Sequence, residues 1–448
     1  MMRSGGFVAL PDAQAFSIRG ARVPGRLLRD IPPGALADAE GSVLIDLRVD
    51  KGRLTAIATA GQAVAGGLPS LDLGGRQLWP TLVDLHTHID KSQVIGRMGR
   101  LGASFASARE AIVKDRQRYW SHEDIRARME FSVRCAYVNG TAALRSHIDS
   151  YEGQAELSWS VFAEVRAAWQ GRVALQATSS VPIDVYATDY GRRLADLAAA
   201  TEGGLLGGVL RRSTDHNYGH MDNIAELLDA QFTLAKVRGL AIDLHVDETL
   251  IAADSHLDEV ARAVMRHGLE GRVVCGHLCS LAAQPDDKIA ASLALCAEAG
   301  IGVVSLPTSN LYMHDRTPGR TPRLRGVTLA QEMLTRNIPF AIASDNVRDA
   351  FIPFGDYDLV DLFRQSIGVY HLDHCLGEAV SMVGPAPARM MGVELIGSLC
   401  VGGPANLIIF DARSINELVC RPQADRVVVN AGCPVTDALP AYAELDVP

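Results

Sequence analysis

The sequence predicts an α/β fold, a (β/α)8 barrel of the TIM type with a small composite β-sandwich domain formed by both chain ends. Three observations lead to this prediction. Apolar runs with strand character alternate with stretches of helical periodicity through the middle of the chain. Several of these runs end in His, Asp or Glu, as active barrel strands do at their C-terminal ends. Short strands separated by turn residues occur at both chain ends.

The β-sandwich domain is expected over residues 1–80 and 395–448. Short apolar runs broken by turns occupy both segments, for example at 42–52 and at 397–411. Neither segment is long enough to bury a core by itself, so we expect the two to pair with each other.

The catalytic barrel is expected over residues 81–394. Its strands are predicted near 81–88, 140–149, 173–182, 204–211, 239–248, 272–279, 301–307 and 338–345. Its helices are predicted at 106–118, 122–139, 154–170, 221–238, 256–267, 286–299 and 329–337. The alternative is an open, doubly wound sheet, which would need a glycine-rich phosphate loop after its first strand. Leu85-His-Thr-His at that place is not such a loop.

Composition limits the partners that the protein can have. The formal net charge of −9 argues against a nucleic-acid surface, and the paired arginines Arg211-Arg212 are interpreted as solvated loop charge. No apolar run approaches the roughly 18 residues that span a bilayer. Eight cysteines without a C-x-x-C pair indicate reduced thiols in a cytoplasmic protein. We expect a homo-oligomer that binds a small molecule, with no nucleic-acid or membrane partner.

Two histidines, His86 and His88, end the first predicted barrel strand. Side chains two residues apart on a strand point to the same face, so both imidazoles are directed at one place. Neutral imidazole is a good ligand for zinc or ferrous iron, and two of them form half of a mononuclear site. The remaining ligands must come from the ends of other strands.

Four further apolar runs end in residues of the required kind. The runs end in His147 and Asp149, in His245 and Glu248, in His277, and in Asp345 and Asn346. The C-terminal ends of parallel barrel strands lie at one face, so we expect these side chains to meet around a single metal.

These motifs resemble those of the amidohydrolase superfamily, and within it the cytosine deaminase branch. The matching residues are Asp84-Leu-His-Thr-His88-Ile-Asp90-Lys91, Arg145-Ser-His147-Ile-Asp149, His245-Val-Asp247-Glu248, Gly276-His277 and Ser344-Asp345-Asn346. The resemblance implies one divalent ion, Fe(II) or Zn(II), and hydrolysis at an amino-bearing carbon of an N-heterocycle. It implies metal ligation by His86, His88, His245 and Asp345, and acid–base roles for Glu248 and His277.

The chemistry of these residues fits the implied roles. Three imidazoles and one carboxylate leave a divalent ion with an open position for water, whose pKa falls from about 16 towards 7, so that a metal-bound hydroxide is the expected nucleophile. Glu248 would then protonate the ring nitrogen, His277 would take the water proton, and Asp345 would pass a proton to the leaving amine.

Residues around the motifs are expected to bind the substrate. Ser180 and Asn346 offer polar groups, and Phe351 could stack on a planar ring or pack in a loop. His147 is expected either to contact substrate or to support His86 or His88 from behind. Two features limit the choice of substrate: no Gln follows the third strand where cytosine deaminases carry one, and Asn346 stands where a second Asp is common, as in similar N-alkyl-triazine amidohydrolases.

The predicted function is hydrolytic deamination of cytosine or a related amino-substituted N-heterocycle by a mononuclear metal enzyme. One metal is expected because relatives with two metals use a carboxylated lysine from the fourth strand, and residues 204–212 contain no lysine. The alternatives are an amidohydrolase that removes an alkylamine from a triazine or opens a cyclic amide, and a barrel that binds a small molecule without turnover.

Overall fold

A computed structural model of the protein describes residues 7–62, 66–99, 102, 104–215, 218–422 and 425–446. The chain divides into two compact units. The first consists of Met1–Asp84, Arg134–Ala143 and Asp358–Ala441. The second consists of Leu85–Val133, Leu144–Tyr357 and Tyr442–Pro448. The domain boundaries expected from the sequence stay a prediction.

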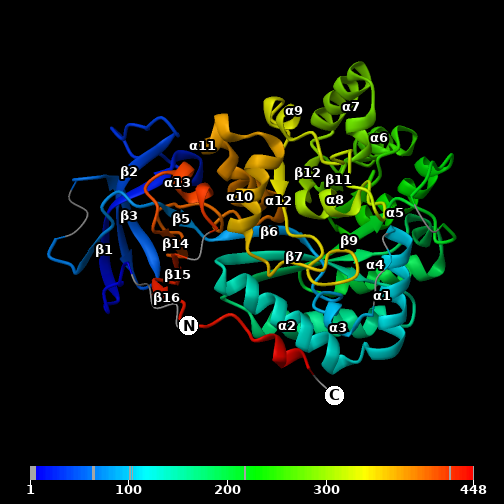
Figure 1. Ribbon diagram of the computed structural model, residues 1–448, viewed down its shortest axis with the longest axis horizontal. Coiled ribbons are helices and arrows are strands. Elements are labelled where there is room, and N and C mark those ends of the chain that lie inside the picture. Colours follow the sequence, from blue (N-terminus) through cyan, green and yellow to red (C-terminus); the bar gives the residue numbers. More distant parts are fainter. Residues whose placement is uncertain are drawn as a thin grey trace. The chain divides into compact units, whose positions relative to one another are not determined.

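The largest sheet has eight strands that neighbour one another in chain order (Figure 1). They are β6 (Leu82–Thr87), β7 (Thr141–Asp149), β8 (Ala174–Ser180), β9 (Gly204–Val209), β10 (Ile242–Val246), β11 (Val273–His277), β12 (Gly302–Ser305) and β13 (Phe340–Ile342). The pairs from β8 to β13 are parallel. A parallel bridge between Thr87 and Asp345 joins the two ends of the sheet. The predicted closed parallel barrel is confirmed.

Helices alternate with these strands along the chain. They are α1 (Phe105–Tyr119), α2 (His122–Val138), α3 (Ala155–Ala168), α4 (Asp189–Ala200), α5 (Ile224–Arg238), α6 (Leu257–His267), α7 (Asp286–Glu298), α8 (Pro307–Met313) and α9 (Ala330–Thr335). Later helices are α10 (Leu359–Tyr370), α11 (Leu376–Ala379), α12 (Pro385–Met391) and α13 (Ile415–Cys420).

Two helices of the barrel unit, α4 and α8, were not predicted from the sequence. For α4 the residues show why. Its polar start, Asp189-Tyr-Gly-Arg-Arg, and the alanines at its end give a weak apolar repeat. A capping signal was nevertheless present, because the hydroxyl of Thr188 accepts a hydrogen bond from the backbone N–H of Gly191.

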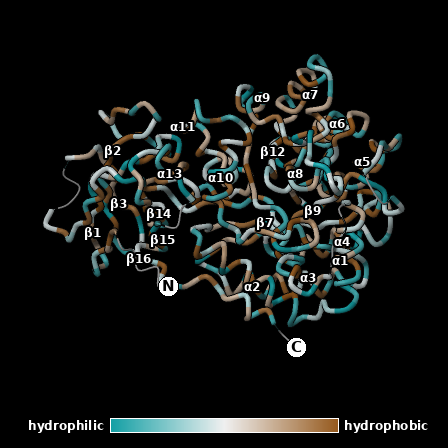
Figure 2. Tube along the Cα trace, in the orientation of Figure 1, coloured by the Kyte–Doolittle hydropathy of each residue, from teal (hydrophilic) through white to brown (hydrophobic). Residues whose placement is uncertain are grey.

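Burial explains the apolar character of the strands. Every residue of β6 and β7 is buried, as expected for parallel strands covered on both faces. The helices, in contrast, carry hydrophilic and hydrophobic residues side by side along their length (Figure 2). Within the described residues, no helix combines the length and the apolar character needed to cross a bilayer.

The chain ends form two further sheets of four strands each. One has the order β3 (Arg53–Thr59), β2 (Ser42–Asp50), β1 (Ala15–Pro24) and β4 (Ser70–Asp72). The other has the order β16 (Cys433–Pro434), β15 (Arg426–Asn430), β14 (Leu407–Phe410) and β5 (Leu78–Pro80). Trp79 of β5 lies opposite Ile408 of β14, so residues from both chain ends share one sheet, as predicted.

Candidate metal centre and active-site pocket

Four predicted ligands meet at the C-terminal ends of the barrel strands. His86 and His88 come from the end of β6, His245 from β10, and Asp345 from the residues after β13. The Nε2 atom of His88 lies 3.2 Å from Asp345 Oδ1 and 3.3 Å from His245 Nε2. His86 Nε2 lies 3.7 Å from the same carboxylate oxygen. We call these four residues the His/Asp group.

The histidines of this group are held in the neutral form that binds metals. Burial, followed by the neighbouring imidazoles, lowers the pKa of His86 and of His245 well below the usual value. Burial, together with the charge of Lys91, lowers the pKa of His88 to about 4. Because His88 Nδ1 lies 3.3 Å from the carbonyl oxygen of His147, Nδ1 carries the proton and Nε2 keeps its lone pair.

The carboxylate of Asp345 is ionised and held by a strained backbone. Burial would raise its pKa, but the neighbouring imidazoles of His88 and His277 outweigh burial and hold the pKa below its usual range. Asp345 and His277 have φ angles of 60° and 74° in the left-handed region, which is unusual for residues with a side chain. Such backbone strain concentrates at functional sites.

The His/Asp group fits a divalent cation. Among the described residues, both ring nitrogens of His86 and the Nδ1 atom of His245 lack a hydrogen-bond partner, although all three atoms are buried. Nitrogen and oxygen acceptors that face one another at 3.2 to 3.7 Å in a buried place would repel unless a cation lies among them. Three imidazoles and a carboxylate are a donor set that zinc and ferrous iron accept.

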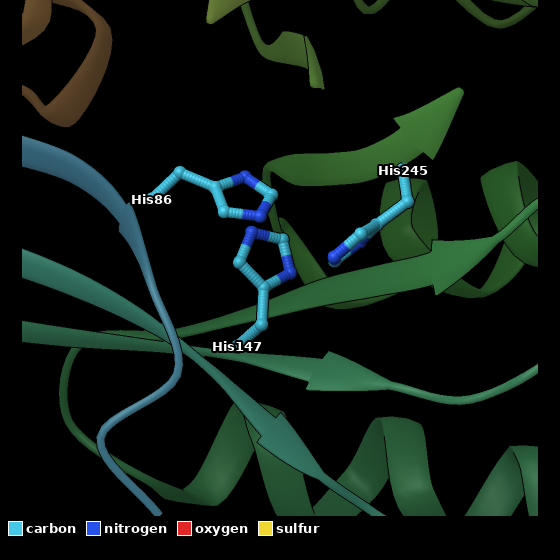
Figure 3. A group of neighbouring side chains, drawn as sticks. All are labelled: His86, His147 and His245. Carbon is cyan, nitrogen blue, oxygen red and sulfur yellow. The ribbon is translucent and has the colours of Figure 1, made fainter. Parts of the chain in front are cut away.

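His147, from β7, lies beside this group rather than in the wall of the pocket. Its ring centroid is 3.9 Å from that of His86 and 4.5 Å from that of His245, and Figure 3 shows the three rings directed toward one another. The three residues form one set of atoms close enough to hold a metal ion, and His86, His277 and Asp345 form another. His147 is therefore a direct neighbour of the predicted ligands and does not line the pocket.

A pocket opens on the His/Asp group and encloses about 600 Å³ of empty space, including its open mouth. Five predicted site residues besides the ligands line it: Ser180, Glu248, His277, Asn346 and Phe351. A depression at the C-terminal ends of barrel strands is the usual place for a small-molecule site.

Glu248 and His277 lie next to each other in the pocket. Glu248 Oε1 is 3.7 Å from His277 Nδ1, and the other carboxylate oxygen accepts a hydrogen bond from the hydroxyl of Tyr218. Burial raises the pKa of Glu248 above its usual value. The side-chain amide of Asn310 lies 3.0 Å from the same Nδ1 atom, which orients the imidazole.

The predicted substrate-binding residues have distinct surroundings. The amide nitrogen of Asn346 donates to Asp349, which leaves the amide oxygen of Asn346 as an acceptor. The ring of Phe351 lies 5.3 Å from the ring of Phe105, and the Nζ atom of Lys91 lies 5.3 Å from the Phe351 centroid. The pocket thus offers aromatic faces as well as polar groups.

Several pocket residues on α1 and after β9 were not predicted from the sequence. Phe105, Arg109, Ile112 and Arg116 recur at helical spacing on one face of α1 and all line the pocket. Arginines on an otherwise apolar helix face were the signal that could have identified them. Arg211, interpreted from the sequence as solvated loop charge, is only 4% exposed and also lines the pocket, so that interpretation was wrong.

A closed parallel barrel with this donor set at its strand ends defines a barrel hydrolase with a divalent metal site. Residues 136–435 match the amidohydrolase family, and the chain belongs to this family. A pterin deaminase from Rhizobium rhizogenes (strain K84 / ATCC BAA-868) is 42% identical over 442 residues, 98% of each chain. N-isopropylammelide isopropyl amidohydrolase from Pseudomonas sp. (strain ADP) is 25% identical over 356 residues, which are 77% of this chain and 82% of that protein.

A solved structure shows the same fold at lower identity. The 5-methylcytosine deaminase from Klebsiella pneumoniae, liganded with 5-fluorocytosine, has a TM-score of 0.78 and 20% identity, over 94% of this chain and 97% of that one. The predicted class is therefore confirmed: the protein is an aminohydrolase of the amidohydrolase family that acts on carbon–nitrogen bonds other than peptide bonds.

Proposed function

We propose that the protein hydrolytically deaminates a pterin, a fused bicyclic heterocycle whose amino group is on a carbon between two ring nitrogens. The support for this substrate is the relative described as a pterin deaminase, which is 42% identical over nearly the whole chain. The observation that carries the reaction type is that the His/Asp group opens into one pocket with Glu248 and His277.

We further propose that the His/Asp group holds one divalent ion, Fe(II) or Zn(II). When bound there, the ion supplies Lewis-acid chemistry that lowers the pKa of water from about 16 to about 7. Two observations support a single ion. The fourth barrel strand, β9, contains no lysine that could bridge two metals, and Lys91 is already paired with Asp149 at 3.3 Å.

Glu248 and His277 divide the proton transfers in this proposal. As the water oxygen bonds to the amino-bearing carbon, the adjacent ring nitrogen gains negative charge and takes a proton from Glu248, whose burial raises its pKa and so favours the protonated form. His277 accepts the proton that the attacking water loses. The two side chains are 3.7 Å apart, so His277 can act on the water that attacks the carbon while Glu248 acts on the adjacent ring nitrogen.

Asp345, whose carboxylate is ionised, completes the reaction by taking the remaining proton of the newly bound hydroxyl group and passing it to the departing amino group. The carbon–nitrogen bond then breaks, and the products are ammonia and a ring carbonyl. Loss of neutral ammonia avoids the formation of an amide anion, which is far too basic to leave at neutral pH.

Aromatic and polar groups of the pocket position the ring. We propose that Phe351, with Phe105, stacks on the flat heterocycle, while Ser180 and the amide oxygen of Asn346 bond to its polar edge. For His147, the contact of its carbonyl oxygen with His88 favours support of a ligand over contact with substrate.

The test is turnover by the purified, metal-loaded protein of pterin, cytosine and N-isopropylammelide, followed through the release of ammonia and of isopropylamine. The proposal predicts ammonia from pterin, with kcat/KM at least about tenfold above that for cytosine, since the pocket binds both rings of a pterin. Release of isopropylamine alone would support the triazine alternative. No turnover of any of the three would contradict deamination of this class of heterocycle.

The remaining expectations from the sequence stay proposals. We propose a cytoplasmic location, supported by eight cysteines that are all free thiols. We also propose a homo-oligomer whose partners are small molecules only. Size-exclusion chromatography with light scattering measures the oligomeric state.

A further inference from the structure

The lining of the pocket holds more cationic side chains than carboxylates. Four cationic side chains line it, namely Lys91, Arg109, Arg116 and Arg211. Of the three carboxylates in the lining, Glu248 and Asp345 lie at the reaction end, and Asp149 lies 3.3 Å from Lys91 Nζ and 3.1 Å from an Nη atom of Arg116, so it is shared by two cations. None of the three forms an ion pair with Arg109 or Arg211.

Arg109 and Arg211 are held together by one backbone oxygen. An Nη atom of Arg109 donates to the carbonyl oxygen of Asp215 at 2.9 Å, and an Nη atom of Arg211 donates to the same oxygen at 3.3 Å. Arg211 also donates to the carbonyl oxygen of Arg212 at 3.0 Å. Partial burial, together with the charge of Arg211, lowers the pKa of Arg109, which shows how near the two like charges are.

No carboxylate of the described residues forms an ion pair with either of these arginines. The acidic groups nearby are engaged elsewhere, since Asp184 accepts hydrogen bonds from Ser213 and Glu248 accepts one from Tyr218. Arg211 is 4% exposed, so water shields its charge poorly. Two like charges in a poorly solvated wall repel each other, and an anion between them would remove that cost.

We infer that Arg109 and Arg211 form a subsite for a carboxylate carried by the substrate. This inference rests on the proposed function and narrows it, because the substrate becomes a pterin with a carboxylate on the ring that lacks the amino group. Each guanidinium has donors besides the Nη atom bonded to Asp215, and paired N–H groups match the two oxygens of a carboxylate. Arg109 and Arg211 then select the substrate, while the His/Asp group and Glu248 act at its other end.

The position of Tyr218 supports this division of the pocket. Its hydroxyl bonds to Glu248, while the positive charge of Arg211 is near enough to act on the pKa of Tyr218. Its ring lies 5.5 Å from that of Phe105, at the start of the helix that carries Arg109. The pocket therefore runs from Glu248 along an aromatic wall to the two arginines, as a flat bicyclic ring with an anionic substituent requires.

The test compares pterin, 6-hydroxymethylpterin, pterin-6-carboxylate and pterin-7-carboxylate in turnover and in calorimetric binding to the metal-loaded protein. One of the two carboxylates should exceed the neutral pterins at least about tenfold in kcat/KM and in affinity, as expected for a charge-assisted hydrogen bond. The preference should shrink in 1 M sodium chloride because salt screens the attraction.

Arg109→Gln and Arg211→Gln should reduce the ratio of anionic to neutral pterin in both measurements to about one. The matched control is Arg118→Gln, an exposed arginine of the same helix that does not line the pocket, and it should keep the ratio. Arg109 is only partly buried, so its variant avoids the folding risk of a substitution at Arg211.

Equal use of neutral and anionic pterins by the unaltered protein would overturn the subsite, even if pterin deamination is confirmed. A ratio that persists in both arginine variants would also overturn it. If none of the four pterins is deaminated, the proposed function fails, and the binding ratio still decides whether the two arginines hold a carboxylate. Failure of every pterin to bind would overturn both proposals.

Discussion

Two clusters of buried charge in the barrel unit differ in whether the protein itself balances them. In the first, an Nη atom of Arg145 lies 2.7 Å from Asp243, and two further guanidinium nitrogens donate to Gln176 at 3.0 and 2.9 Å. Both charged side chains are at most 2% exposed. In the second, the His/Asp group, acceptor atoms face other acceptor atoms at 3.2 to 3.7 Å.

The difference distinguishes a structural cluster from a ligand site. A buried guanidinium with acceptors around it needs nothing from outside the chain. Buried acceptors that face one another need a cation, which only a ligand supplies. The chemistry of the neighbouring atoms therefore distinguishes a structural cluster from a ligand site better than the degree of burial does.

The largest expected effect concerns the second cluster. Asp345→Ala should lower metal content well below one ion per chain and reduce turnover by about a thousandfold or more, since the Lewis acid contributes several kcal/mol to catalysis. Metal analysis after gel filtration and ammonia release measure the two losses. Asp196→Ala, which removes an exposed carboxylate that pairs with Arg238, should keep both metal and activity. Full metal content in the Asp345 variant would remove the contrast between the clusters.

The next effect concerns the first cluster. Arg145→Met leaves Asp243 buried without its cation, so the free energy of unfolding should fall by about 3–5 kcal/mol. Urea denaturation of the metal-loaded protein measures it. The control Arg192→Met removes an exposed ion pair with Asp189 and should change stability by less than about 1 kcal/mol. Equal losses in the two variants would show that the buried pair contributes no more than a surface pair.

A smaller effect is expected where the ligand site adjoins the proton donor. Glu248→Gln should keep the metal but reduce kcat by about a hundredfold or more, because the amide cannot protonate the ring nitrogen. Glu259→Gln, at the start of α6 outside the pocket, should retain normal turnover. Activity of the Glu248 variant close to normal would assign the proton transfer to another group.

The smallest effect is a shift in pH dependence. The hydrogen bond from Tyr218 lowers the pKa of Glu248, so Tyr218→Phe should raise that pKa further. Glu248 acts while protonated, and activity falls as pH rises through its pKa. The alkaline limb of the kcat/KM profile should therefore move to higher pH, with about a tenfold loss of activity at the optimum. An unchanged limb would mean that another group limits activity there.

The sequence was sufficient for the fold and for the ends of the barrel strands. His86, His88, His245 and Asp345 could be placed together because each ends an apolar run, and the topology of a parallel barrel brings those ends to one face. The composite sheet of β5 and β14 followed from the shortness of both end segments.

The remaining pocket residues depend on tertiary contacts that no local pattern contains. Tyr218 lies in a loop, and its role appears only where its hydroxyl meets Glu248. The pair Arg211-Arg212 is typical of solvated loop charge in the sequence, whereas folding buries Arg211. Assigning Arg109 to the pocket requires the position of α1 beside the pocket, and the helical repeat alone does not predict that position.

The pairing of β5 with β14 has a consequence for biosynthesis. β5 ends at Pro80, but its partner begins only at Leu407, so the early strand leaves the ribosome long before the late one exists. Until then, its backbone donors and acceptors lack their sheet partner, and an unpaired edge of this kind invites association between nascent chains. A message truncated before codon 407 should therefore yield protein that aggregates rather than a smaller soluble enzyme.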